Sequence, residues 1–178
     1  SASSAASDVY KRQRPIDEND NSWRPYDTIF GGFWQGGKHW SEVLADDAIN
    51  FIEDSKKYKD PYFMYLAFNA PHDPRQAPKR FLEMYPLEKI SLPPNYSSQH
   101  PFWKEIGNEP GVRDEALAPY PRSEYAVKKH IQEYYAVITH LDEQVGKIIS
   151  HLENQDMLKN TYITVSYTHL TLPTMRLV

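Results

Sequence analysis

The sequence predicts an α/β fold in which a long helix packs across parallel strands. Residues 62–68 read Tyr-Phe-Met-Tyr-Leu-Ala-Phe and are apolar on both faces, which is typical of a central parallel strand. Residues 161–165 are β-branched or aromatic and predict a second strand. A long crossover and a helical pattern over residues 123–152 lie between them. Because this order forms a βαβ-type unit, we expect the two strands to be parallel and adjacent or nearly so.

The other elements follow from local patterns. Ser41 is a suitable N-cap for a helix that ends before Asp60-Pro61, and its apolar face consists of Leu44, Ala48, Phe51 and Ile52. Residues 79–85 predict a short helix, and the prolines of residues 86–121 predict a long irregular loop. The helix over residues 123–152 carries one apolar stripe, formed by Ile131, Tyr134, Ile138, Leu141, Val145, Ile148 and Leu152.

The composition fits one compact domain or a large piece of one, with 178 residues of which 40% are hydrophobic. A net charge of −4 gives no basic surface for nucleic acid. No apolar stretch approaches the roughly 20 residues that span a bilayer, so we expect no transmembrane segment. The absence of cysteine excludes disulfides, thiolate metal sites and a cysteine nucleophile within this chain.

His72 is the first candidate for chemistry. It lies four residues beyond Phe68, and in open α/β sheets ligands bind outside the carboxyl ends of the strands. Pro71 and Pro74 flank it and stiffen the backbone. An imidazole in that place could bind an oxyanion or shuttle a proton. Position alone supports equally well a loop histidine that bonds to a nearby carbonyl.

Three stretches, in matching order and spacing, resemble the type I sulfatases of the alkaline-phosphatase-like superfamily. Residues 61–93 contain an apolar strand, the motif Ala-Pro-His-x-Pro, a short helix and Tyr-Pro-Leu. Residues 133–166 resemble the long helix and the Asn-Thr strand that follow in that family, and residues 41–53 resemble the helix upstream. The resemblance implies part of a sulfatase-like sheet sandwiched by helices, truncated at both ends.

The resemblance also implies hydrolysis of a sulfate ester, on a small molecule or a carbohydrate, in the periplasm or outside the cell. The family uses a formylglycine, made from Cys or Ser in a Cys-x-Pro-x-Arg motif, and a divalent cation, usually Ca²⁺. Only His72 carries over, at the family position that binds the sulfate ester and stabilises the leaving oxygen. No Cys-x-Pro-x-Arg motif is present, and Tyr167 stands where a metal-binding Asp is expected. We therefore expect no metal ligands here and no activity of this chain alone.

Lys38 and His39 are weaker candidates for substrate binding. They lie in Gly-Gly-Lys-His-Trp at residues 36–40, directly before a helix, and could reach a substrate from that loop. The alternative is a glycine-rich turn that packs Trp34 against Trp40.

The two ends do not continue the family pattern. We expect residues 1–22 to be disordered or foreign, residues 23–166 to be a fragment of a sulfatase catalytic domain, and residues 167–178 to be a foreign tail. A divergent native terminus is the alternative.

Two other functions stay open from the sequence. A phosphodiesterase or phosphonate hydrolase of the same superfamily would carry Thr or Ser as its nucleophile. A non-catalytic binding protein would lack the nucleophile and metal ligands, as this chain does.

Overall fold

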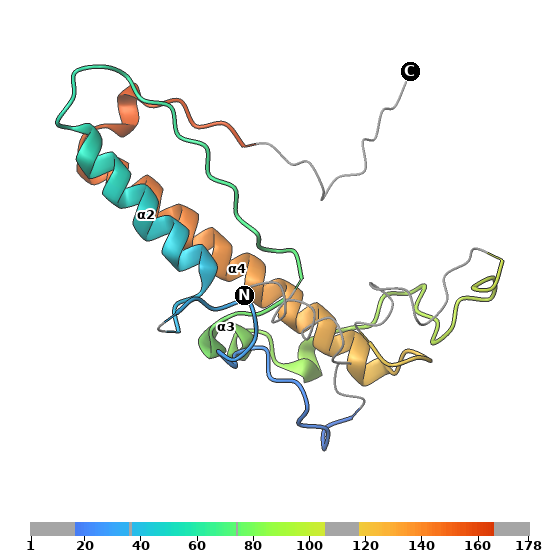
Figure 1. Ribbon diagram of the computed structural model, residues 1–178. Helices are drawn as coiled ribbons and strands as arrows, with labels where there is room; N and C mark the ends of the chain where they lie inside the picture. The colour runs from blue at the N-terminus through green and yellow to red at the C-terminus, as the bar shows by residue number, and fades with distance from the viewer. Residues whose placement is uncertain (1–16, 36, 74, 106–117, 166–178) are drawn as a thin grey trace, which may run out of the picture.

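The structure is a computed structural model that describes residues 17–35, 37–73, 75–105 and 118–165. Two long helices, α2 (Trp40–Ser55) and α4 (Glu124–Asn154), lie side by side and run in the same direction (Figure 1). The short helix α3 (Lys79–Glu83) lies against α4, and two 3₁₀ turns, η1 (Leu87–Lys89) and η3 (Leu158–Asn160), complete the helical elements of the described residues.

Local capping explains where the long helices begin. The Ser123 hydroxyl accepts the N–H of Ala126 at 3.1 Å, and α4 then runs unbroken for 31 residues, which confirms the predicted helix. The N-cap expected at Ser41 is wrong by two residues. His39 is the N-cap of α2, because its ring Nδ1 accepts the N–H of Ser41 at 3.1 Å. The short helix expected at residues 79–85 is confirmed as α3.

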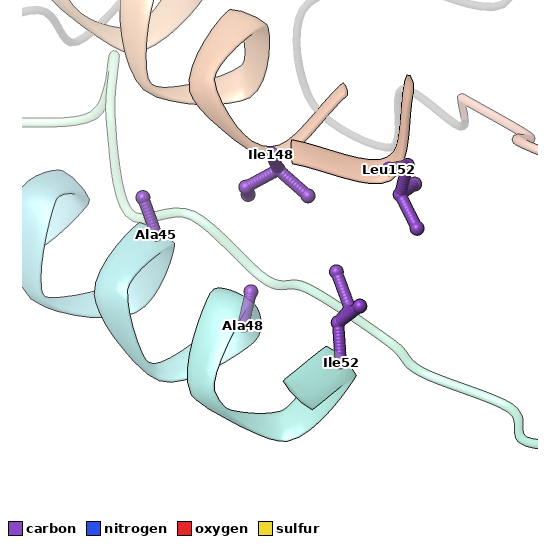
Figure 2. Close-up of a cluster of buried hydrophobic side chains, with 5 residues drawn as sticks. All are labelled: Ala45, Ala48, Ile52, Ile148 and Leu152. Carbon is purple, nitrogen blue, oxygen red and sulfur yellow. The ribbon is translucent and has the colours of Figure 1, made fainter. Parts of the chain in front are cut away.

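A small apolar core joins α2 to the C-terminal half of α4. Figure 2 shows its five buried side chains, Ala45, Ala48, Ile52, Ile148 and Leu152. The extended segment at residues 62–68 runs back along these helices and covers the core with every second side chain: Tyr62, Met64, Leu66 and Phe68. Removal of this apolar surface from water is the main stabilising contribution at this end of the molecule.

The predicted apolar stripe of α4 is right at its C-terminal end and wrong in the middle. Ile148 and Leu152 are buried, but Ile138 is exposed. The central turns of α4 instead bury polar side chains, namely Gln132, Glu133, His140 and Gln144. This face can be polar because these groups find partners on the segments that pack against it.

The two segments expected to form strands are extended but unpaired. Phe63 is 88% exposed and Tyr65 is 79% exposed, while the alternate residues of the segment face the helices. Residues 161–165 leave the same end of the helix pair and run in the same direction (Figure 1). Within the described ranges no β-ladder forms, and the only bridge joins Phe33 to His39. The sheet is therefore not confirmed, because neither segment forms a ladder with another backbone of the described residues, and parallel pairing stays a prediction.

Some expectations fall wholly or partly outside the described residues. Those for residues 1–16 and 166–178 cannot be compared with the structure, and the same holds for residues 106–117 of the long loop. The described parts of that loop, residues 86–105 and 118–121, are irregular apart from η1, as predicted.

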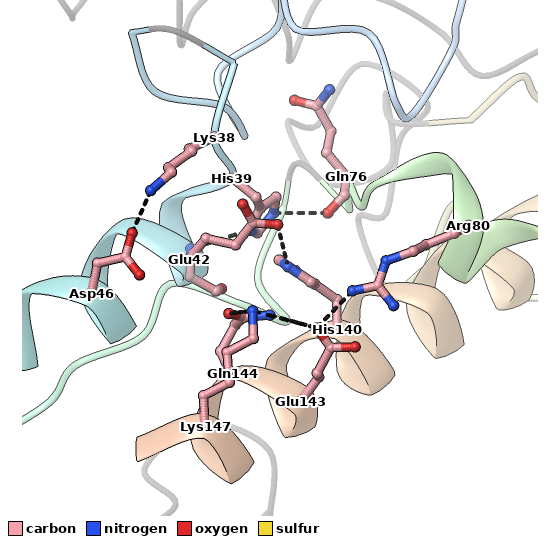
Figure 3. A network of polar contacts seen from close by, with 11 residues as sticks. Lys38, His39, Glu42, Asp46, Gln76, Arg80, His140, Glu143, Gln144 and Lys147 are labelled. Carbon is pink, nitrogen blue, oxygen red and sulfur yellow. Dashed lines mark hydrogen bonds and ion pairs between the residues drawn. The ribbon is translucent and has the colours of Figure 1, made fainter. Parts of the chain in front are cut away.

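A buried polar seam, which we define as His39, Glu42, Gln76 and His140, joins α2 to α4 (Figure 3). The rings of His39 and His140 meet edge to face, with centroids 4.5 Å apart. His140 Nε2 donates to Glu42 Oε1 at 3.1 Å, and His39 Nε2 donates to the Gln76 carbonyl at 2.9 Å. These partners only accept, so Nε2 of each ring carries a proton. The Nδ1 of His39 accepts the N–H of Ser41 and carries none, so the His39 ring is neutral.

The seam resists protonation of both rings. Burial, and to a smaller extent the nearby His140, lower the pKa of His39 to about 4. Burial also lowers the pKa of His140 to about 4, and its Nδ1 is buried without a hydrogen-bond partner. At the rim, a hydrogen bond from Arg80 lowers the pKa of Glu143 to about 2.

The apolar core between α2 and α4 predicts that shortening a buried side chain lowers the free energy of unfolding more than shortening an exposed one. Ile52→Ala should lower the free energy of unfolding by about 2–4 kcal/mol, because it leaves a cavity against Ile148 and Leu152. The matched control is Ile29→Ala, the same change at a side chain that is 71% exposed, with an effect of about 0.5 kcal/mol or less. Urea titration measures both, and equal effects would contradict the packing in Figure 2.

The outward face of residues 62–68 predicts binding of a hydrophobic dye. Phe63→Ser with Tyr65→Ser should lower the fluorescence of an added anilinonaphthalene sulfonate, because the two exposed rings are removed. Tyr58→Ser serves as the control, since Tyr58 is also exposed but lies before the segment. An unchanged signal in the double variant would show that this face does not bind the dye.

The seam predicts a loss of stability in acid. Both histidines have an ordinary pKa of 6.5 when unfolded and about 4 when folded, so the unfolded chain binds more protons between these values. The free energy of unfolding should therefore hold above pH 6.5 and fall between pH 6.5 and 4, by on the order of 2–3 kcal/mol per histidine. The lowered pKa of Glu143 affects the free energy of unfolding only below about pH 4.5, the ordinary pKa of this group.

The variant His39→Asn with His140→Gln tests this, because Asn keeps the N-cap acceptor and neither new residue titrates. Its stability should change little between pH 6.5 and 4, as followed by urea unfolding at each pH. His100→Gln, at an exposed histidine, should keep the wild-type slope. A double variant with an unaltered slope would assign the acid sensitivity to other groups.

Candidate active-site loop

His72 lies on a tight turn directly after the extended segment. Its backbone N–H donates to the Asn69 carbonyl at 2.9 Å, and its side chain is exposed. The ring Nδ1 donates to the Asp73 carbonyl at 3.0 Å. Because a carbonyl only accepts, Nδ1 carries a proton, and Nε2 is the nitrogen that remains for a ligand. The two interpretations of His72 are thus compatible, since the carbonyl bond occupies only one ring nitrogen.

Gln76 anchors the chain that leaves this turn. Its side chain is fully buried; Oε1 accepts the N–H of Gly32 at 2.7 Å, and Nε2 donates to the carbonyls of Asp27 at 2.9 Å and Pro25 at 3.3 Å. A Cβ at Gly32 would lie 2.7 Å from the Gln76 side chain, so this approach requires glycine. The residue after the turn is therefore held by the segment 25–32.

The segment 25–32 is in turn held by α4. Trp23 is buried, stacks on Phe30 with ring centroids 4.7 Å apart, and donates from Nε1 to Glu133 Oε1 at 2.7 Å. Glu133 is a fully buried carboxylate of α4. The loop after His72 is thus connected through Gln76 and Trp23 to the longest helix of the molecule.

Arg75 connects the turn to α4 by a second route. Its Nη1 forms an ion pair with Asp73 Oδ1 at 2.9 Å, and its Nη2 donates to His130 Nδ1 at 2.6 Å. The Asp73 and Arg75 side chains are only 15% and 18% exposed. No motif in the sequence marks Arg75, Gln76 or His130; the one available signal was that polar residues directly follow the His72 turn.

Lys38 is exposed and His39 is buried. Lys38 pairs with Asp46 at 2.5 Å, and that hydrogen bond raises the Lys38 pKa. His39 is buried in the seam, which disfavours direct contact with a substrate. The expected alternative is present: the Trp34 and Trp40 rings lie 4.3 Å apart across a turn whose Gly37 has φ of +84°. His39 is joined to the segment that follows His72 by its bond to the Gln76 carbonyl.

The described residues do not provide a metal site. No group of three or more His, Cys, Asp or Glu side chains among them is arranged to hold a metal ion. In the same part of the chain, none of the helices is both long and apolar enough to cross a membrane.

Comparison with known proteins places these features in a family. A family model described as Sulfatase matches residues 4–166. A protein named Sulfatase from Formosa agariphila is 32% identical over 140 residues, which are 72% of this chain and 26% of that protein. Mouse iduronate 2-sulfatase is 32% identical over 134 residues, covering 70% of this chain and 24% of the enzyme.

A solved structure, that of a putative sulfatase yidJ from Bacteroides fragilis, matches with 25% identity and a TM-score of 0.45, over 70% of this chain and 23% of that one. This chain spans about a quarter of the length of the relatives it matches. The family model, in contrast, covers well over half of this chain. The chain therefore belongs to the sulfatase family.

Proposed function

We propose that this chain is part of a sulfatase that hydrolyses sulfate esters of small molecules or carbohydrates, and that His72 contacts the ester. The proposal rests on one observation in a chain of the sulfatase family. The His72 ring is exposed, and a hydrogen bond from Nδ1 to the Asp73 carbonyl fixes its orientation. For the intact enzyme we propose a periplasmic or extracellular location, as the resemblance implies.

In this proposal His72 acts through Nε2. The Asp73 carbonyl holds the Nδ1 proton and so orients the ring. When protonated, Nε2 donates to the ester oxygen on which negative charge develops as the S–O bond breaks. The buried Gln76 and the Arg75 ion pair restrain the backbone on one side of the ring. These contacts favour a fixed donor over a mobile one.

The nucleophile and the metal belong, in this proposal, to parts of the enzyme outside this chain. The chain contains no cysteine, and the described residues do not fit a metal site. A formylglycine and Ca²⁺ would supply the nucleophile and positive charge. We expect this chain alone to be inactive on sulfate esters.

Substitution of His72 tests the proposal. In the intact enzyme, His72→Ala should lower kcat for an aryl sulfate by on the order of 10²–10³, because one donor to the developing charge is lost. The melting temperature should change little, since the ring is exposed. His100→Ala, at an exposed histidine of the long loop, is the control and should leave kcat unchanged.

Turnover close to wild type in His72→Ala would reject the proposed role, as would a loss of activity that only follows a lower melting temperature. An intact enzyme that hydrolyses a phosphate diester and not an aryl sulfate would instead identify a phosphodiesterase of the same superfamily.

A further inference from the structure

We propose that Arg75 is a positioning residue that fixes the imidazole of His72 by tying its turn to α4. The inference depends on the proposed function only for the claim that His72 takes part in catalysis. The positioning itself follows from contacts within the described chain.

Asp73 links the two side chains. Its backbone carbonyl accepts from His72 Nδ1, and its carboxylate pairs with Arg75 Nη1 at 2.9 Å. Because both groups belong to one residue, the ion pair with Arg75 restrains the residue whose backbone carbonyl holds the His72 ring. The Arg75–Asp73 pair is largely buried, so release would leave an uncompensated charge.

The second contact of Arg75 provides the fixed point. Its Nη2 donates to Nδ1 of His130, which lies on the unbroken helix α4. A guanidinium only donates, so His130 Nδ1 accepts and the ring proton lies on Nε2. The planar fork of arginine reaches the two partners through separate nitrogens, a geometry that the single nitrogen of lysine does not reproduce.

Gln76 limits the effect of Arg75 to the turn that carries His72. The Gln76 side chain holds residue 76 to the segment 25–32 without help from Arg75. Loss of Arg75 should therefore loosen the turn between the extended segment and Gln76, and leave the remaining fold in place. A purely structural arginine would change the melting temperature without changing the state of the His72 ring.

The first test measures the His72 tautomer in the 178-residue chain by ¹⁵N NMR of the histidine rings, with His72→Gln used to assign the signal. Wild type should show mainly the Nδ1–H form, and Arg75→Lys and Arg75→Gln should shift it toward the Nε2–H form. Arg80→Gln is the matched control, since Arg80 pairs with Glu143 of α4 at 2.6 Å but does not contact the turn. It should leave the His72 signal unchanged.

Substitutions at His130 test the fixed point. His130→Gln retains an oxygen acceptor for the guanidinium and should keep the Nδ1–H form, whereas His130→Leu removes the acceptor and should resemble Arg75→Gln. Melting temperatures are measured for every variant, and Arg75→Lys is the comparison used if Arg75→Gln does not fold.

The second test measures kinetics in the intact enzyme. Arg75→Lys should lower kcat for an aryl sulfate by about 10- to 100-fold, with a smaller change in KM, because a displaced group loses its alignment with the reacting atoms.

An unchanged tautomer in the Arg75 variants would overturn the inference, even if His72→Ala abolishes turnover. If the Arg75 variants change the His72 tautomer but His72→Ala keeps full activity, the positioning role of Arg75 stands and the proposed function is rejected.

Discussion

The buried amide of Gln76 is the contact on which most of the described structure depends. Its carbonyl oxygen and amino group bond three backbone groups of the segment 25–32, and its own backbone carbonyl accepts from His39 at the start of α2. A single residue thus joins the N-terminal segment, α2 and the turn that carries His72. Because a buried amide left without partners costs free energy, this arrangement favours one register of these segments over others.

The helices are held together by two different kinds of contact. At one end, Ala48, Ile52 and Ile148 form an apolar core that would tolerate small shifts in helix position. At the other end, the seam around His39 and His140 requires specific donors and acceptors. Hydrogen bonds depend on direction, whereas apolar contacts depend mainly on area, so the seam determines how α2 and α4 are aligned.

His72 combines an exposed ring with a restrained backbone. The ring keeps Nε2 for a ligand, while Asp73, Arg75 and Gln76 restrain the chain that follows it. The supporting contacts come from residues distant in sequence, including His130 of α4. This combination of an accessible ring and buried polar contacts suits the donor role that we propose for His72.

The sequence by itself determined the features that arise from local interactions. The period of α4 and its cap at Ser123 are properties of neighbouring residues, and so is the turn with Pro-His-Asp that made His72 a candidate. Tertiary structure alone decided the polar middle of α4, the burial of His39, and the roles of Arg75, Gln76 and His130, because each depends on a partner tens of residues away. The sheet also lies beyond local patterns. The continuous apolar run of residues 62–68 indicates an extended backbone, but a ladder forms only where a second backbone lies alongside to exchange hydrogen bonds.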